Sequence, residues 1–202
     1  MFVHLKTKTI YSLLEGAIFA KALADRCSEF KMPAVGITDR ANLFGALEFS
    51  EVLSDNGIQP IIGCQLPIAA KEINLARYSA SDQLSILFLA KNEIGYRNLM
   101  ELSSKFFLNE AYRLEGVSIG EIDRFSEGLI CLSGGDESPI NNLLRDNKSK
   151  EAVALLKHFK RTFGNRFYLE INRHPSADDN IKKKKIEDNI LGLADDYSLP
   201  LV

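Results

Sequence analysis

Short apolar runs recur along the chain, and polar or helix-like sequence separates each run from the next. Seven of these runs have the length and the β-branched or aromatic content of strands. They cover residues 3–7, 34–38, 60–67, 86–90, 129–133, 167–172 and 199–202. Runs such as "SILFLA" and "PIIGC" are apolar at nearly every position, as is typical of parallel strands that are covered on both faces.

Helical patterns lie between most of the predicted strands. They cover residues 17–30, 42–54, 94–108 and 140–163, the last with a break near Asp146, and a final helix opens at Ser176 and runs to about Tyr197. The stretch 110–126 is the least regular, and we expect a loop there with at most a short helix. Strands that alternate with helices in this way predict an α/β fold with a parallel sheet, such as an α/β barrel.

The last residues, "SLPLV", fall in the middle of the predicted seventh strand. A natural domain seldom ends inside a buried strand, because the loop that follows normally carries functional residues. We therefore expect residues 1–202 to form a single but incomplete domain, with further domain residues beyond 202.

The composition is that of an ordinary globular protein, with 46% hydrophobic and 26% charged residues. The net charge of −2 provides no basic field, so this chain is not expected to be a main contact for nucleic acid. The basic run at residues 182–185 is most simply a solvated helix face. The cysteines show no CxxC spacing, and the sequence has no pattern of a signal peptide or membrane span, so we expect a reduced, cytoplasmic protein with no membrane partner.

In a parallel α/β barrel, the chemistry belongs to the loops after the carboxyl ends of the strands. A hydrolytic metal centre would need several His, Asp or Glu side chains to converge there. Only Asp39 and His174 are of that type, and the neighbouring lysines and arginine would repel a metal ion. The residues at the predicted strand ends are Lys6, Lys8, Asp39, Arg40, Gln65, Gly134, Gly135, Arg173 and His174. We therefore expect no catalytic residue, metal or other cofactor in this chain.

Several blocks of the sequence resemble the PHP (polymerase and histidinol phosphatase) domain at the start of the α subunit of bacterial DNA polymerase III, the C-family replicative polymerase. The blocks are "FVHLKTKTIYSLLEGA", "AVGITDRANLFGALEFSE", "GIQPIIGCQLPI", "LAKNEIGYRNLMELSSKFFL", "EGLICLSGG" and "FGNRFYLEINRH". They span essentially the whole chain and occur in order. The resemblance implies a distorted (β/α)7 barrel of PHP type, here ending within its seventh strand, with polymerase domains beyond residue 202.

The resemblance also indicates which positions carry metal ligands in the family. The family's H-x-H pattern falls on Lys6 and Lys8, and its "TDHG" motif falls on Asp39 and Arg40, so only the aspartate is kept. The remaining family ligand positions within this chain are Gln65, Ser85, Gly135 and His174, of which only the histidine is kept. Further family ligands would follow residue 202. The resemblance thus implies a degenerate metal site with vestigial ligand positions.

The implied function is that of a structural scaffold within a DNA-directed DNA polymerase in DNA replication. Its partners would be the rest of the polymerase chain and, in some members, the separate proofreading exonuclease subunit. The parent enzyme would be a magnesium-dependent nucleotidyltransferase that contacts DNA through its other domains. The alternatives are a metal-dependent phosphoesterase or 3′–5′ exonuclease of the PHP superfamily and a stand-alone histidinol phosphatase, and the lost ligands count against both.

The lysine pair suggests how such a site could lose its metal. An unpaired buried carboxylate is costly, so Asp39 would need a fixed cation once the metal was gone. We expect Lys6, Lys8 or Arg40 to supply it from about 4 Å or through one bridging water. For Asp39 and His174 we therefore favour structural roles over surviving metal ligation.

Overall fold

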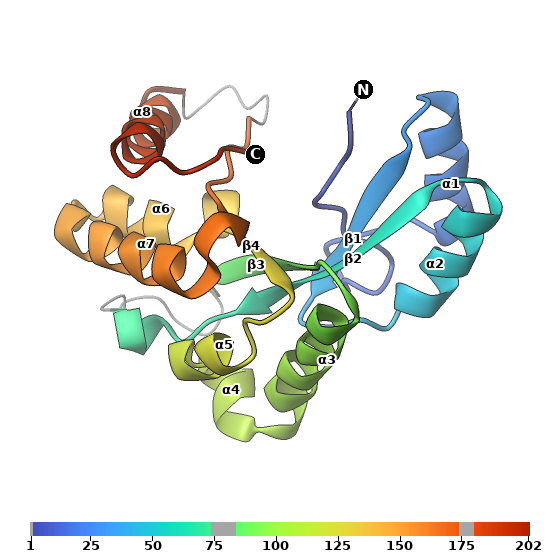
Figure 1. Ribbon diagram of the computed structural model, residues 1–202, viewed down its shortest axis with the longest axis horizontal. Coiled ribbons are helices and arrows are strands. Elements are labelled where there is room, and N and C mark those ends of the chain that lie inside the picture. The colour runs from blue at the N-terminus through green and yellow to red at the C-terminus, as the bar shows by residue number, and fades with distance from the viewer. Residues whose placement is uncertain (1, 74–83, 174–179) are drawn as a thin grey trace.

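A five-stranded mixed sheet runs through the molecule, and helices surround it (Figure 1). The computed structural model describes residues 2–73, 84–173 and 180–202. The strands occur in sequence order across the sheet: β1 Ala34–Arg40, β2 Gln59–Pro67, β3 Ser85–Ala90, β4 Leu129–Leu132 and β5 Phe167–Tyr168. The helices are α1 Ala20–Glu29, α2 Ala46–Asp55, α3 Glu93–Leu108, α4 Glu110–Glu115, α5 Ile119–Arg124, α6 Pro139–Arg145, α7 Ser149–Phe163 and α8 Asn180–Asp196.

The prediction of an all-parallel sheet is wrong for β3. The pairs β1–β2 and β4–β5 are parallel, but β3 runs antiparallel to both of its neighbours. Parallel neighbours need a crossover connection, which α2 provides between β1 and β2, and α6 and α7 provide between β4 and β5. Between β2 and β3, the described residues include a short 3-10 helix, Ala70–Ile73, and β3 runs back along β2.

The first and last predicted strands are extended segments that flank the sheet. Residues 3–7 lie along β1, where Gly36 N–H donates to the His4 carbonyl at 2.6 Å and Thr38 N–H donates to the Thr7 carbonyl at 2.9 Å. At the other edge, Leu169 and Leu201 form an isolated parallel bridge. All seven apolar runs therefore lie in the predicted order, but only five of them are strands of the sheet.

The two flanking segments do not close the sheet into a barrel among the described residues. A cavity of about 560 Å³ lies between them. Val3, Leu5 and Lys6 line it from the first segment, while Ile171 and Val202 line it from the other side. The part of the fold that the structure describes is therefore an open α/β sheet.

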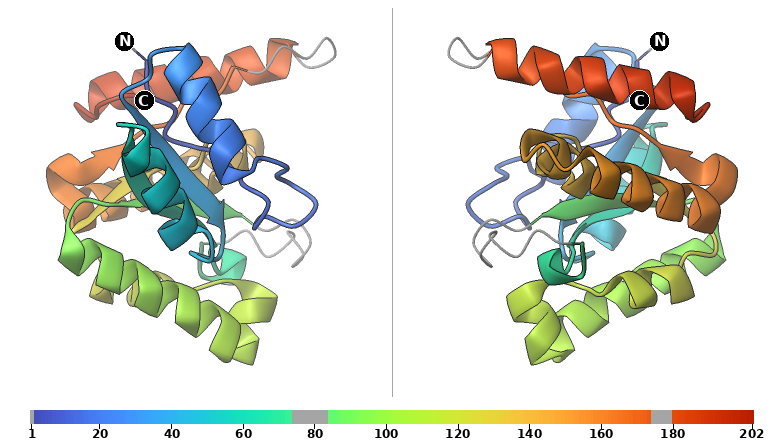
Figure 2. Two further views of the ribbon diagram at one scale, coloured as in Figure 1. Left: turned by 90° about the vertical axis from the view of Figure 1, so that its right-hand side faces the viewer. Right: turned by 90° about the vertical axis from the view of Figure 1, so that its left-hand side faces the viewer.

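The main core lies on the face of the sheet that packs against α3 and α7. Along β3, Ile86 and Phe88 belong to the large apolar cluster with α3 and α7, whereas Leu87 and Leu89 turn to the opposite face and pack near Leu5. Both faces of β3 are thus covered, which explains its uninterrupted apolar sequence. In both views of Figure 2, α8 lies on the opposite side of the molecule from α3.

The predicted helices are present, and two more occur where a loop was expected. The break in the fourth predicted helix separates α6 from α7, as expected. The expectation of a loop with at most a short helix over 110–126 is wrong, because both α4 and α5 form there. The predicted start of the last helix at Ser176 lies outside the described residues. Within the described parts of the chain, no helix is long and apolar enough to cross a membrane.

Candidate functional site: a charge network at the strand ends

The predicted site residues meet at one edge of the sheet because of the strand directions. β1, β2 and β4 run the same way, so their carboxyl ends lie at a common edge. β3 runs the opposite way, and its first residue, Ser85, therefore lies at that same edge, opposite Pro67. Ser85 thereby joins Gln65 and Arg40, although it begins a strand while the other two lie near strand ends.

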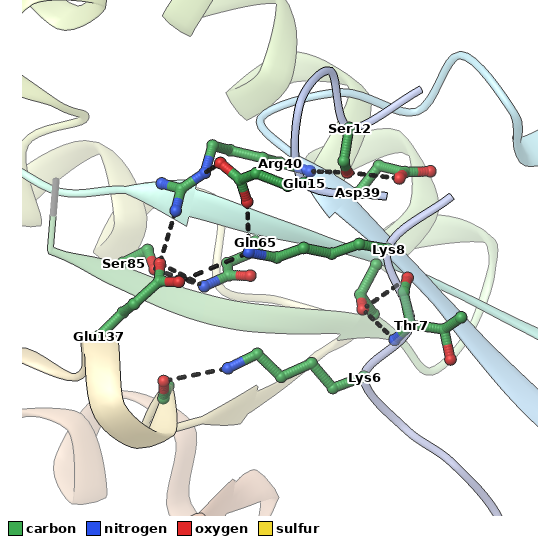
Figure 3. Close-up of polar contacts among 12 residues, drawn as sticks. Lys6, Thr7, Lys8, Ser12, Glu15, Asp39, Arg40, Gln65, Ser85 and Glu137 are labelled. Carbon is green, nitrogen blue, oxygen red and sulfur yellow. Dashed lines mark hydrogen bonds and ion pairs between the residues drawn. The ribbon is translucent and has the colours of Figure 1, made fainter. Parts of the chain in front are cut away.

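Glu137 lies at the centre of this edge (Figure 3). It belongs to a short 3-10 helix, Gly135–Glu137, that follows β4. Its Oε2 atom accepts hydrogen bonds from Arg40 Nη2 at 2.7 Å, Gln65 Nε2 at 2.8 Å and Ser85 Oγ at 2.8 Å. Side chains at the positions of three family ligands therefore converge on a carboxylate.

Glu15 completes a ring of alternating charges with Glu137. Arg40 Nε lies 2.6 Å from Glu15 Oε1, while its Nη2 contacts Glu137. Lys8 makes the same double contact, because its Nζ binds Glu15 Oε2 and lies 3.5 Å from Glu137 Oε1. Each of the two cations therefore bridges the same two carboxylates.

Lys6 reaches a different carboxylate. Its Nζ lies 3.2 Å from Glu170 Oε1 and donates to the Gly134 carbonyl at 3.2 Å. Glu170 follows β5 and is only 6% exposed. Its other oxygen, Oε2, has no hydrogen-bond partner among the described residues. Lys6 is thus the one cation among the described residues that forms an ion pair with this buried carboxylate.

Asp39 forms no direct ion pair with Lys6, Lys8 or Arg40, so the expectation of a cation within about 4 Å of Asp39 is wrong. Its Oδ1 accepts from Thr9 N–H at 2.7 Å and Ser12 Oγ at 2.5 Å, and its Oδ2 accepts from Thr9 Oγ1 at 2.7 Å. The physical reason is the alternation of side chains along β1. Asp39 lies two residues after Ile37 and therefore shares its face of β1, and Ile37 packs in the core with α1 and α2. Arg40 points to the other face.

The charges around Glu137 lower its pKa. Burial by itself would raise the pKa of this carboxyl group, because it disfavours the charged form. The hydrogen bond from Ser85 and the positive charges of Arg40, Lys8 and Lys6 outweigh that effect and hold the pKa below its ordinary value. Glu137 is therefore ionised at neutral pH and acts as a fixed anion.

Gly135 occupies a position where a side chain would not fit. Its φ angle is +60°, and a Cβ atom there would lie 2.1 Å from Asn172 Nδ2 and 2.8 Å from Glu170 Oε1. A side chain could be accommodated at this position only if Asn172 and Glu170 moved. Gly135 instead lets the short helix that carries Glu137 approach the end of β5 closely.

This arrangement does not fit a metal cluster. The family ligand positions present two lysines, an arginine, an amide and a hydroxyl, and the central Glu137 oxygen already accepts three hydrogen bonds. Among the described residues, no group of three or more His, Cys, Asp or Glu side chains could hold a metal ion. The ion pairs can hold four parts of the chain together: the first extended segment with the loop after it, β1, the 3-10 helix Gly135–Glu137 and the stretch that follows β5.

Sequence reasoning found the cations of this site but missed its anions. Lys6, Lys8, Arg40, Gln65 and Ser85 are brought together at the edge of the sheet, with Gly135 in the adjoining turn. Asp39 lies on the other side of β1, and His174 lies outside the described residues. The missed residues are Glu15, Glu137 and Glu170. Glu170 carried a signal, because an acidic residue inside the apolar run "FYLEIN" needs a partner.

Comparisons with known proteins agree on one family. Residues 4–174 match the PHP domain family. The chain is 43% identical over 203 residues to the DNA polymerase III subunit alpha of Caulobacter vibrioides, and 35% identical over 202 residues to that of Rickettsia bellii. Both matches include 100% of this chain, but the chain spans only 17% and 16% of the lengths of these relatives.

A solved structure has the same fold. It is that of a candidate metal-dependent phosphoesterase from Bifidobacterium adolescentis, and it superposes with a TM-score of 0.58. The superposition covers 98% of this chain and 84% of the other, at 10% sequence identity. At that identity, the likeness shows a shared fold.

Proposed function

Because this chain belongs to the PHP domain family, matching DNA polymerase III α subunits over its whole length, we propose that it is a non-catalytic scaffold within such a polymerase. The observation that most directly supports this proposal is the charge network centred on Glu137. A domain that hydrolysed phosphate esters through metal ions would need ligands where Lys6, Lys8 and Arg40 stand. Fold and chemistry are separable, so a well-packed PHP fold can be retained for its structure alone.

The open sheet is proposed to be part of a distorted seven-stranded PHP barrel. The two extended segments that flank β1 and β5 support this proposal, because they lie where the first and seventh strands of such a barrel would run. Residues 1–202 would then belong to a single PHP domain. The cavity between the flanking segments is where closure of the barrel would occur.

Within the parent polymerase, the proposed partners are the remaining polymerase domains and the proofreading exonuclease subunit. The catalytic step, addition of deoxynucleotides to a primer with magnesium, would belong to those other domains. The support is that relatives named as polymerase subunits are about six times longer than this chain, which spans 16–17% of their lengths.

Metal content tests the non-catalytic proposal. The purified chain would be dialysed against zinc, manganese and iron, and the bound metal measured by elemental analysis. We expect no stoichiometric metal and no hydrolysis of p-nitrophenyl phosphate or of 3′-labelled single-stranded DNA. Two or more tightly bound ions per chain, together with metal-dependent hydrolysis, would overturn the proposal.

Co-elution tests the docking role separately. The chain would be mixed with the proofreading exonuclease subunit of the same organism and analysed by size-exclusion chromatography. We expect a complex of the two proteins. Separate elution of both proteins at concentrations well above micromolar would contradict docking on this chain, but would leave the scaffold role intact.

A further inference from the structure

An apolar patch lies on the surface where α2 begins beside α3. It consists of Phe44 and Phe107, whose rings are in contact, together with the exposed Leu47 on α2 and Met100 on α3, and we call it the α2–α3 patch. Phe44 is 66% exposed and Leu47 is 71% exposed, and the Phe44 and Phe107 rings stack with their centroids 5.9 Å apart. Met100 and Phe107 lie two turns apart on the same face of α3. Figure 2, left, shows α2 and α3 next to one another on the side of the molecule that faces the viewer.

The α2–α3 patch is held in place by the core beneath it. Phe106, the neighbour of Phe107, is buried in the main apolar cluster, and the two rings pack edge to face at 5.4 Å. On α2, Phe49 and Leu53 are fully buried, so the opposite face of that helix is fixed toward solvent. Large apolar side chains that are exposed yet fixed in this way are typical of an interaction surface.

The charges around the α2–α3 patch are acidic. Residues 41–56 contain Glu48, Glu51 and Asp55 but no lysine or arginine. On α3, the exposed Glu101 follows Met100 directly. The two cations of α3 are each offset by a carboxylate, because Arg97 pairs with Glu93 at 2.6 Å and Lys105 pairs with Glu121 at 3.0 Å. The apolar surface is thus bordered by negative charge.

The negative charge around the α2–α3 patch favours some classes of binding partner over others. Nucleic acid and anionic membranes carry the same sign of charge and would be repelled. A second copy of the chain would bring the same acidic border, so self-association through this patch is opposed as well. A partner that offers apolar side chains flanked by lysine or arginine would satisfy both parts of the surface.

We propose that the α2–α3 patch binds a basic amphipathic helix of another protein segment. Apolar side chains at i, i+3, i+4 and i+7 of that helix would cover Phe44, Leu47 and Phe107. Its basic residues would lie against Glu48, Glu51 and Glu101. The proposal does not depend on the strand-end charge network, so it can fail while the scaffold function stands.

Two synthetic peptides test the proposal with the 202-residue chain. Both are helices of about five turns with leucine at i, i+3, i+4 and i+7, and the remaining positions carry lysine in one peptide and glutamate in the other. Binding would be measured by fluorescence anisotropy at low and high salt. We expect the lysine peptide to bind, to weaken as salt screens the charges, and to bind at least about tenfold more tightly than the glutamate peptide.

Variants locate the binding surface. The double substitution Phe44→Ser and Leu47→Ser should weaken binding of the lysine peptide by about tenfold or more. The substitutions Glu51→Gln and Glu101→Gln leave the apolar surface intact and should remove most of the salt dependence. The matched control is Phe30→Ser with Glu29→Gln at the end of α1, where Phe30 is 63% exposed. This control should bind as the unchanged chain does.

Three results would overturn the proposal: equal binding of both peptides, equal weakening by the Phe30 control, or no binding of the lysine peptide. Dimerisation of the chain that is lost in the Phe44→Ser and Leu47→Ser variant would likewise overturn it in favour of a second copy. Thermal unfolding of each variant, followed by circular dichroism, would show whether the substituted chains are folded when binding is measured.

Discussion

Asp39 and Arg40 are neighbours in the sequence, yet their side chains serve different parts of the molecule. Asp39 is 2% exposed and binds the hydroxyl and backbone groups of the loop after the first extended segment. Arg40 bridges Glu15 and Glu137 on the other face of β1. Hydroxyl and N–H donors can therefore satisfy a buried carboxylate without any counter-charge.

Two double-mutant cycles should show that Asp39 is coupled to the hydroxyl group of Ser12 and not to the cation Lys6. Asp39→Ala removes the acceptor for three hydrogen bonds and should destabilise the chain by about 2–3 kcal/mol. Combined with Ser12→Ala, its effect should be clearly less than additive, because the two residues share a hydrogen bond. Combined with Lys6→Ala, the effects should add within about 0.5 kcal/mol. Urea unfolding measures all of these, and strong coupling between Asp39 and Lys6 would contradict the assignment.

Glu137 should make stability depend on pH. Its pKa is lower in the folded chain than its ordinary value of about 4.3, so the folded state is stabilised when the group is ionised. That contribution is fully present above the ordinary pKa and is lost as pH falls through the lower folded value. The stability difference between the unchanged chain and Glu137→Gln should therefore shrink as urea unfolding is repeated from neutral pH to acid. A difference that stays constant would argue against the network.

At this scale the sequence predicted half of the site. The three cations were expected to offset Asp39, but they pair with Glu15, Glu137 and Glu170 instead. Which anions meet them was not predictable, because Glu137 and Glu170 lie about 130 and 160 residues away along the chain. Asp39 lies at the end of a predicted strand, but the alternation of β1 points it away from the cations. Glu15 lies only seven residues after Lys8 and was missed.

Among the elements, helices α4 and α5 show how end signals outweigh a weak periodic pattern. Asn109 Oδ1 accepts from Ala111 N–H at 2.9 Å and Tyr112 N–H at 3.3 Å at the start of α4. Ser118 Oγ accepts from Glu121 N–H at 3.2 Å at the start of α5. Asparagine and serine are common residues at helix starts, whereas helices of one or two turns are too short to show a clear apolar stripe.

The cap at Asn109 can be tested by substitution. Asn109→Ala should destabilise the chain by about 1 kcal/mol, because it leaves two N–H groups of α4 without their acceptor. Asn109→Asp keeps the acceptor and serves as the control, with little expected change. Hydrogen exchange should show faster opening of residues 110–115 in the alanine variant alone. Equal protection in both variants would mean that packing, and not the cap, determines α4.

The direction of β3 was the other error at the scale of elements. An apolar run predicts a strand and its burial, and the seven runs do lie in the predicted order. An apolar run does not indicate the direction of its strand, because the side-chain period and the hydrophobicity are the same when the strand is read either way. The pairing of β3 with β2 and β4 shows that it runs antiparallel to both.

For the whole molecule, the charge network connects the two ends of an open sheet. The first extended segment hydrogen-bonds to β1, and Lys6 on that segment reaches Glu170 beyond β5. The cavity between the flanking segments lies beside this ion pair, and both residues line it. Lys6 and Glu170 therefore connect parts of the chain that the described backbone hydrogen bonds do not join.

A cycle on this pair tests whether it holds the two ends together. Lys6→Met keeps much of the side-chain volume but leaves the buried Glu170 without its cation. Breaking a fully buried pair costs about 3–5 kcal/mol, and because Lys6 is partly exposed we expect about 2–3 kcal/mol here. Glu170→Gln should also destabilise, because Lys6 then faces a neutral group.

The double variant should lose less stability than the sum of the two single losses, because neither charge is left unpaired. Urea midpoints of the four proteins give the coupling, and hydrogen exchange at residues 4–7 should rise in Lys6→Met. Additive losses with unchanged exchange would mean that the packing of Leu5 and the backbone hydrogen bonds to β1 are sufficient to fix the first segment. In that case Lys6 would be dispensable to the open sheet, and the charge network would act only around Glu137.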